Sequence, residues 1–312
     1  MSSDRLGKFK LDKASILISD LRGFTYFSEK HSALDVANLL DRYFSIMIPI
    51  ITKHDGVVDK LTGDSILAIF KFKTNNINNV LACAIDMQNA MQQVNSTNRE
   101  LGISSIYMGI GINTGEVATG YIGNKSHFKY TAIGNEVNLA ARVEAYSMRG
   151  QVLLSDNSFD ICKTKVVVGS SYDVQPKGTI RPLKIYELLE LLEPEKLKLN
   201  IENSRSEPRI NVDMPINYHL IDKAKILPEI YEGQTIDVSY MGLKFKSINK
   251  LEPLSEIALK VSSSIFGVEK STVYAKVQHS IFVDGYYISG LLFTVIDDAA
   301  LASMKSFIDN SI

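Results

Sequence analysis

The first 190 residues alternate between two patterns of apolar side chains. Residues 14–20, "ASILISD", form an apolar run rich in isoleucine, which is typical of a buried strand. Residues 33–56 instead place apolar side chains at helical spacing, and we expect Pro49 to bend this helix and Gly56 to end it. The predicted apolar face of the helix comprises Val36, Leu40, Tyr43, Met47 and Ile51.

A hairpin and further strands follow this helix. The runs "GVVDKL" (56–61) and "SILAIF" (65–70) flank a Gly-Asp turn signal, which predicts a hairpin with Asp64 at its tip. The pattern then predicts a helix from about 79 to 92, strands at 106–115 and 127–134, a helix beginning near Asn135, and a strand at 182–190. This succession predicts an α+β or α/β domain that ends near residue 190.

The composition changes at residues 193–209, a charged stretch that contains Pro194 and Pro208. We interpret residues 193–204 as a linker that could include a short helix. Beyond it, short apolar runs separated by turn signals predict a small β-barrel over residues 205–312. An amphipathic segment at the end of the chain predicts a closing helix with Asp297 or Asp298 as its N-cap.

Charge and cysteine content exclude several classes of function. The chain has 34 Lys and Arg against 35 Asp and Glu, so its net charge of −1 gives no bulk attraction to a nucleic acid polymer or a membrane surface. No apolar run approaches the ~18 residues of a membrane span, and the N-terminus lacks a signal-peptide core, so we expect a soluble, cytoplasmic protein. Cys83, Cys162 and the five histidines show no disulfide or metal-ligand spacing.

Two aspartates stand where a metal ion and a phosphate could bind. Asp20 ends an apolar strand and precedes "LRGFT", so a cation at its carboxylate could lie beside a phosphate held by the backbone amides of Gly23, Phe24 and Thr25. Asp64 supplies a second carboxylate, and two such groups can hold two magnesium ions. The alternatives are an N-cap role for Asp20 and a surface ion pair between Asp64 and Lys60.

Three other polar residues could contact a nucleotide. Asn138 and Arg142 are four residues apart in "GNEVNLAAR", so they share one face of a helix, where they could grip a ribose and a phosphate. A solvated helix face is the alternative. Lys177 precedes a glycine in a loop beside a strand, where it could meet a terminal phosphate.

These segments follow one another in the same order as in the class III nucleotidyl cyclases. Residues 10–192 resemble the catalytic domain of that family. The resemblance implies an α+β, ferredoxin-like fold with a βαββαβ core, acting as a homodimer. It implies two Mg²⁺ or Mn²⁺ ions held by Asp20, Asp64 and the Leu21 carbonyl. Asn138 and Arg142 would position the ribose and stabilise the transition state, and Lys177 would contact the triphosphate. The resemblance therefore predicts catalysis of nucleotide cyclisation.

The resemblance also assigns recognition of the purine to Lys60 and Thr131. A lysine can donate to an adenine ring nitrogen and a threonine hydroxyl can accept from the adenine amino group, whereas guanine would require an acidic residue at position 60. We therefore expect ATP as substrate, with a guanylate cyclase as the alternative. Active sites in homodimeric members lie across the interface, so Lys60 and Asp64 would serve two different sites. Glu116 departs from the family pattern, because some members carry a basic residue there.

Residues 205–312 resemble the PilZ domain, a small barrel that binds cyclic di-GMP. The resemblance rests on Arg205 and Arg209 in "RSEPR" and on Asp237, Ser239 and Gly242 in "DVSYMG". The arginines can stack on guanine and bind phosphates, the aspartate and serine can hydrogen-bond guanine, and the glycine permits close approach. We expect cyclic di-GMP to regulate the cyclase by ordering residues 193–209. The alternatives are a barrel that only mediates contacts, or a non-catalytic receptor that uses the cyclase fold to dimerise.

Overall fold

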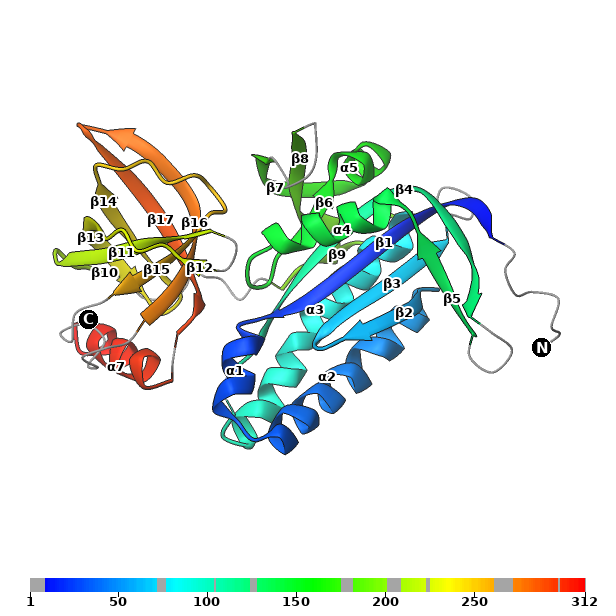
Figure 1. Ribbon diagram of the computed structural model, residues 1–312, viewed down its shortest axis with the longest axis horizontal. Coiled ribbons are helices and arrows are strands. Elements are labelled where there is room, and N and C mark those ends of the chain that lie inside the picture. Colours follow the sequence, from blue (N-terminus) through cyan, green and yellow to red (C-terminus); the bar gives the residue numbers. More distant parts are fainter. Residues whose placement is uncertain are drawn as a thin grey trace. The chain divides into compact units, whose positions relative to one another are not determined.

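Residues 1–200 are the first of two units in the computed structural model and contain a mixed sheet with helices on both faces (Figure 1). The structure describes residues 9–71, 77–103, 105–123, 128–174, 182–200, 209–222, 225–260, 272–296 and 298–311. None of the helices in this described part is both long and apolar enough to cross a membrane.

The first unit begins with a βαββαβ succession. Its elements are β1 (Lys10–Arg22), α1 (Phe24–Lys30), α2 (Ala33–Lys53), β2 (Val57–Thr62), β3 (Ser65–Lys71), α3 (Ile77–Glu100) and β4 (Tyr107–Gly123). The strands lie in the order β2-β3-β1-β4, and each neighbouring pair is antiparallel. This is the ferredoxin-like order, so the predicted α+β fold class is confirmed.

Further elements extend the sheet beyond β4. They are β5 (Phe128–Ile133), α4 (Asn135–Tyr146), β6 (Val152–Ser155), α5 (Asp156–Cys162), β7 (Val166–Val174), β8 (Leu183–Leu191) and β9 (Leu197–Lys198). β5 pairs with β4, and β6, β8 and β7 continue the sheet on that side. Four of these elements, β6, α5, β7 and β9, were not predicted. β9 pairs with β8, so part of the segment that we interpreted as a linker belongs to the first sheet.

Alternate residues of β1 face opposite sides of the sheet, so each face offers apolar side chains against which helices pack. Leu17 packs in the larger core with side chains of α2 and α3, whereas Ile16 and Ile18 pack with Ala140 of α4. The buried face of α2 comprises Leu39, Tyr43, Met47 and Ile51. The last three predicted positions are fully buried, Val36 and Leu40 are partly buried against the same core, and Leu39 is a buried residue that was not predicted. α2 continues past Pro49, and α3 is longer than predicted.

The second unit, residues 201–312, contains a closed barrel. Its elements are β10 (Ile210–Asn211), β11 (Pro215–Asp222), β12 (Lys225–Ile226), β13 (Tyr231–Ser239), β14 (Gly242–Ser247), β15 (Glu256–Lys260), β16 (Thr272–Val283), β17 (Tyr286–Val295) and α7 (Asp298–Asp309). The pairing β13-β14-β17-β16-β15-β11 returns to β13, which closes a ring of six strands. The predicted small barrel is confirmed.

Large aromatic side chains fill the barrel, and α7 packs against the same core. Tyr218, Phe245 and Phe293 are fully buried. α7 contributes Ala300, Met304 and Ile308, which are four residues apart and so lie on one helical face. The predicted closing helix is therefore present. Asp297, one of the two predicted N-cap residues, lies outside the described residues.

The barrel core predicts how two phenylalanine substitutions differ. Phe245→Ala removes a fully buried ring and should lower the free energy of unfolding by about 3–5 kcal/mol, because it leaves a cavity. Phe282→Ala in the same barrel removes a ring that is 61% exposed and should cost roughly 0.5 kcal/mol or less. Urea-induced unfolding of both variants measures the difference. Equal destabilisation by the two substitutions would contradict this assignment of the core.

Candidate functional site

The two predicted metal-binding aspartates lie together at one end of the first sheet. Asp20 is near the end of β1, and Asp64 follows Gly63 in the tight turn between β2 and β3. Gly63 has a φ of +61°, a conformation that glycine adopts without strain. The Leu21 amide donates a hydrogen bond of 2.9 Å to the Asp64 Oδ2 atom. This bond fastens the hairpin tip to the strand end and so brings the two carboxylates close to each other.

The electrostatics of this pair favour a bound cation. Burial, with the charge of Asp20 close by, raises the pKa of Asp64 to about 7, although the Leu21 amide acts in the opposite direction. Burial also raises the pKa of Asp20, against the effect of the Arg22 guanidinium. Two carboxylates that resist ionising together are stabilised by a divalent cation, and Mg²⁺ is commonly held by one or two carboxylates with phosphate and water. The donor set therefore fits Mg²⁺ or Mn²⁺.

Among the described residues, no cluster of three or more His, Cys, Asp or Glu side chains could hold a metal ion. The metal site would thus depend on the two aspartates, on backbone oxygen such as the predicted Leu21 carbonyl, and on ligands from the substrate. Such a site is typical of nucleotide-dependent enzymes, in which phosphate oxygens complete the coordination.

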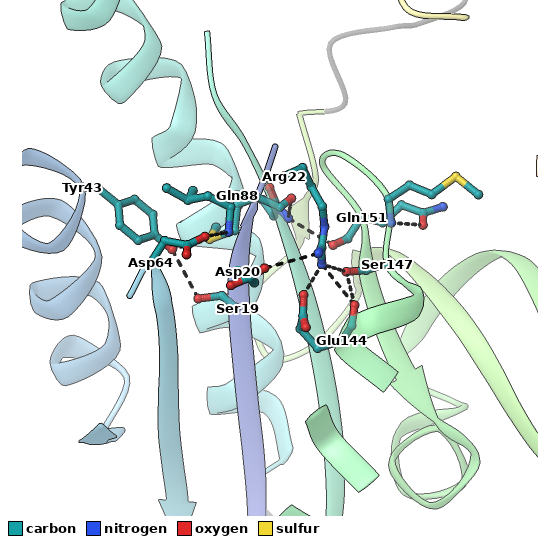
Figure 2. Close-up of polar contacts among 12 residues, drawn as sticks. Ser19, Asp20, Arg22, Tyr43, Asp64, Gln88, Glu144, Ser147 and Gln151 are labelled. Carbon is teal, nitrogen blue, oxygen red and sulfur yellow. Dashed lines mark hydrogen bonds and ion pairs between the residues drawn. The ribbon is translucent and has the colours of Figure 1, made fainter. Parts of the chain in front are cut away.

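Arg22, which the sequence analysis did not single out, connects β1 to α4 (Figure 2). Its Nη1 atom is 3.5 Å from Asp20 Oδ2. Its Nη2 atom donates to the Glu144 carboxylate, to the Glu144 carbonyl at 3.1 Å and to Ser147 Oγ at 2.8 Å. Glu144 and Ser147 lie at the C-terminal end of α4, so Arg22 fixes this helix relative to the carboxylates. The only local signal for this role was an arginine two residues after the aspartate.

α4 carries the predicted ribose and phosphate residues. Its buried face comprises Ala140, Val143 and Glu144, whereas Asn138 is exposed and Arg142 is half-buried. Within the described part of the chain, neither Asn138 nor Arg142 has a side-chain hydrogen bond or ion pair. Both side chains are therefore available to a ligand.

Lys60 and Thr131, the predicted base-reading residues, come from β2 and β5. Lys60 is exposed and, among the described residues, forms no ion pair with Asp64, so the alternative of a surface ion pair is wrong. Thr131 is buried, and its hydroxyl donates a hydrogen bond of 2.8 Å to Asp59 Oδ2. The Lys129 Nζ atom lies 3.2 Å from the other Asp59 oxygen. Asp59 was missed because its partners are about seventy residues away in sequence.

The remaining predicted residues of the first unit are less well defined. Gly23 precedes α1 with a φ of +80°, and its carbonyl accepts a hydrogen bond from the Phe27 amide. Phe24 packs against the larger core. The side chain of Thr25, together with Lys177, lies outside the described residues. Glu116, the departure from the family pattern, is exposed on β4.

In the second unit, a buried aspartate holds two basic side chains. Asp237 on β13 forms ion pairs with Arg209, at 3.0 Å, and with Lys244 of β14, at 3.1 Å. Ser239 ends the same strand, and its hydroxyl donates to the carbonyl of Gly242. A Cβ atom at Gly242 would lie 2.0 Å from the Leu291 carbonyl oxygen, so the close approach that this glycine permits is to β17. Arg205 lies outside the described residues, and Lys244 was not predicted.

Comparison with known proteins agrees with the fold and the site of the first unit. Residues 7–188 match the family described as the adenylate and guanylate cyclase catalytic domain. The terminal-differentiation-specific adenylate cyclase of Dictyostelium discoideum is 32% identical over 198 residues, which cover 61% of this chain and 9% of that protein. The chain spans less than a third of the length of the first curated relatives that it matches.

Two solved structures resemble the same part of the chain. The guanylyl cyclase Cya2 is 38% identical with a TM-score of 0.58, covering 61% of this chain and 98% of that one. The adenylyl cyclase CyaB from P. aeruginosa is 30% identical with a TM-score of 0.55, covering 58% and 96%. The family match extends over more than half of the 312 residues. The chain therefore belongs to the family of adenylate and guanylate cyclase catalytic domains.

Proposed function

We propose that the protein is an adenylate cyclase that converts ATP to 3′,5′-cyclic AMP and pyrophosphate. The observation that carries this proposal is the pairing of Asp20 and Asp64, which the Leu21 amide holds together beside the helix that bears Asn138 and Arg142. In the reaction the ribose 3′-oxygen bonds to the α-phosphorus, the bond from that phosphorus to the β-phosphate oxygen breaks, and the 3′-hydroxyl proton is released.

Each group of side chains has a separate task in this reaction. Asp20, Asp64 and the Leu21 carbonyl would hold two Mg²⁺ or Mn²⁺ ions, and such ions would supply activation of the 3′-hydroxyl and neutralisation of charge at the transferring phosphorus. Asn138 orients the ribose, and Arg142 stabilises the charge that develops on the phosphate oxygens. Lys177 binds the triphosphate, with the amides of Gly23, Phe24 and Thr25.

The choice of ATP over GTP rests on Lys60 and Thr131. The similar proteins include both adenylyl and guanylyl cyclases, so their names do not decide between the two substrates. Lys60 is exposed and can donate to an adenine ring nitrogen, and Thr131 can accept from the adenine amino group. A guanylate cyclase would need an acceptor at position 60, which this chain lacks.

We place the complete active site across a homodimer. β2, β4 and β5 expose apolar side chains in the part of the unit that carries Lys60 and Thr131, and exposed apolar residues that cluster mark contact surfaces. These residues are Val57, Leu61, Ile122, Phe128 and Ile133, each 41–49% exposed. In such a dimer, Asp64 of one protomer and Lys60 of its partner act on the same ATP molecule.

We further propose that the barrel is a PilZ domain that binds cyclic di-GMP and regulates the cyclase. The closed six-stranded barrel and the pairing of Arg209 with Asp237 support this assignment. Arg205 and Arg209 bind the phosphates and stack on the bases, and Asp237, Ser239 and Gly242 form the rest of the site. Ligand binding at this site shifts the geometry of the catalytic dimer.

Turnover tests the catalytic proposal. With Mn²⁺, the wild type should convert ATP to cyclic AMP and should act on GTP far more slowly, whereas Asp20→Asn and Asp64→Asn should each lower kcat by roughly 10²-fold or more, because a cation ligand is lost. Asp160→Asn, which alters a carboxylate that is 72% exposed on α5, is the control and should keep full activity. Chromatography of the products measures both reactions.

Absence of turnover in the wild type, combined with binding of cyclic di-GMP, would favour the alternative of a non-catalytic receptor. Turnover that survives both aspartate substitutions would refute the metal assignment. A wild type that prefers GTP would replace the proposed substrate with that of the guanylate cyclase alternative.

Calorimetry tests the proposed regulator. Arg209→Ala should weaken binding of cyclic di-GMP by at least about tenfold, since it removes a charged contact to the ligand. Lys250→Ala is the control, because Lys250 is an exposed cation of the same unit that pairs with the exposed Glu252 nearby. Binding of cyclic di-GMP that leaves turnover unchanged would show that the barrel is a docking module and does not regulate catalysis. Failure of the wild type to bind cyclic di-GMP would exclude the barrel as a cyclic di-GMP receptor.

A further inference from the structure

A buried carboxylate controls the hydroxyl that is proposed to read the base. The Asp59 side chain is only 1% exposed, and it accepts the hydrogen bond from Thr131 Oγ1 at 2.8 Å. A threonine hydroxyl has one proton to donate and two lone pairs that accept. An ionised carboxylate can only accept, so this contact uses the single proton of Thr131.

An irregularity in β2 brings Asp59 to this position. Val58 pairs with Ala68, and Lys60 pairs with Leu67, so Asp59 is an extra residue in the β2–β3 ladder. Val58 and Ala68 pack on the side of the larger core, whereas Leu67 packs on the opposite side of the sheet. Such a bulge re-aims side chains, and bulges are frequent beside active sites. Here the bulge directs Asp59 to Thr131 and places Lys60 directly after it.

The charge of Asp59 is compensated by a neighbouring cation. Lys129 lies two residues before Thr131 on β5, and its Nζ atom is 3.2 Å from Asp59 Oδ1. A nearby opposite charge stabilises a buried charged group. The Lys129 side chain is 52% exposed, so its ammonium group also remains in contact with solvent.

We infer that Asp59 is a positioning residue that sets base selectivity by fixing the direction of the Thr131 hydroxyl. With its proton held by Asp59, Thr131 presents only lone pairs to a base. A purine with an amino group at position 6 donates to those lone pairs, whereas a purine with a carbonyl there meets them with another acceptor. Asp59 therefore favours adenine over guanine. This inference rests on the proposed function and refines the proposed action of Thr131.

The test compares kcat/KM for ATP and GTP in Asp59→Asn. An asparagine amide can donate to Thr131 Oγ1, which frees the threonine proton to reach a guanine carbonyl. The ratio of the ATP value to the GTP value should fall by at least about tenfold, with a gain for GTP, because buried polar mismatches discriminate strongly between substrates. In a Thr131→Val background, Asp59→Asn should change the ratio no further, because the hydroxyl is absent.

The chain offers a closely matched control in Asp12→Asn. The Asp12 carboxylate accepts a hydrogen bond of 2.8 Å from Thr119 Oγ1 and lies 3.0 Å from Lys10 Nζ, which repeats the Thr-Asp-Lys arrangement between β4 and β1. Neither Thr119 nor Asp12 is assigned to base recognition. This variant should therefore keep the wild-type ratio.

The outcomes separate the inference from the proposed function. Equal losses for ATP and GTP in Asp59→Asn would show that Asp59 is only structural, and would overturn the inference while leaving the cyclase assignment intact. If Asp59→Asn does not fold, Asp59→Ala poses the same question, because it also releases the threonine proton. A wild type that cyclises neither nucleotide would overturn the proposed function, and the inference with it.

Discussion

The hydrogen bond from the Leu21 amide to the Asp64 carboxylate is the contact on which the site of the first unit depends. β1 is central in the sheet and the β2–β3 hairpin lies beside it, so their ends meet at one edge of the domain. Two carboxylates at such an edge repel each other, and burial increases the cost of ionising both. The strand pairing and this single bond nevertheless keep them together, which leaves a site that a divalent cation stabilises.

Arg22 connects the strand that carries Asp20 to α4. It contacts Asp20 on its own strand and Glu144 and Ser147 at the end of α4. α4 packs on the sheet through Ala140 and Val143 and leaves Asn138 and Arg142 without partners in the described part of the chain. The positions of these two side chains relative to the carboxylates are thus set by the sheet, by Arg22 and by helix packing.

Local patterns predicted much of this arrangement. The apolar run that ends at Asp20, the turn signal before Asp64 and the i, i+4 spacing of Asn138 and Arg142 each lie within one short segment, and the structure contains all three elements. The closing helix and the barrel strands were predicted for the same reason. In contrast, Asp59 contacts Thr131, 72 residues away, and Arg22 contacts Glu144, 122 residues away. No pattern within a short segment predicts such long-range contacts. The pairing of β11 with β13 that closes the barrel is likewise non-local.

Thermal unfolding as a function of pH, with and without Mn²⁺, tests the central claim that two carboxylates are held together for a cation. Because the pKa of Asp64 is raised to about 7, the metal-free folded state binds this proton more tightly than the unfolded state does. The contribution of Asp64 to stability is therefore greatest at low pH and is lost as the pH rises through about 7.

We predict that Asp64→Asn gains in Tm relative to the metal-free wild type as the pH rises from about 5 to about 8, since the amide carries no charge. Mn²⁺ should raise the Tm of the wild type more at the higher pH, and should have little effect on Asp64→Asn. Parallel pH profiles for the two proteins, with equal stabilisation by Mn²⁺, would contradict the existence of this cation site.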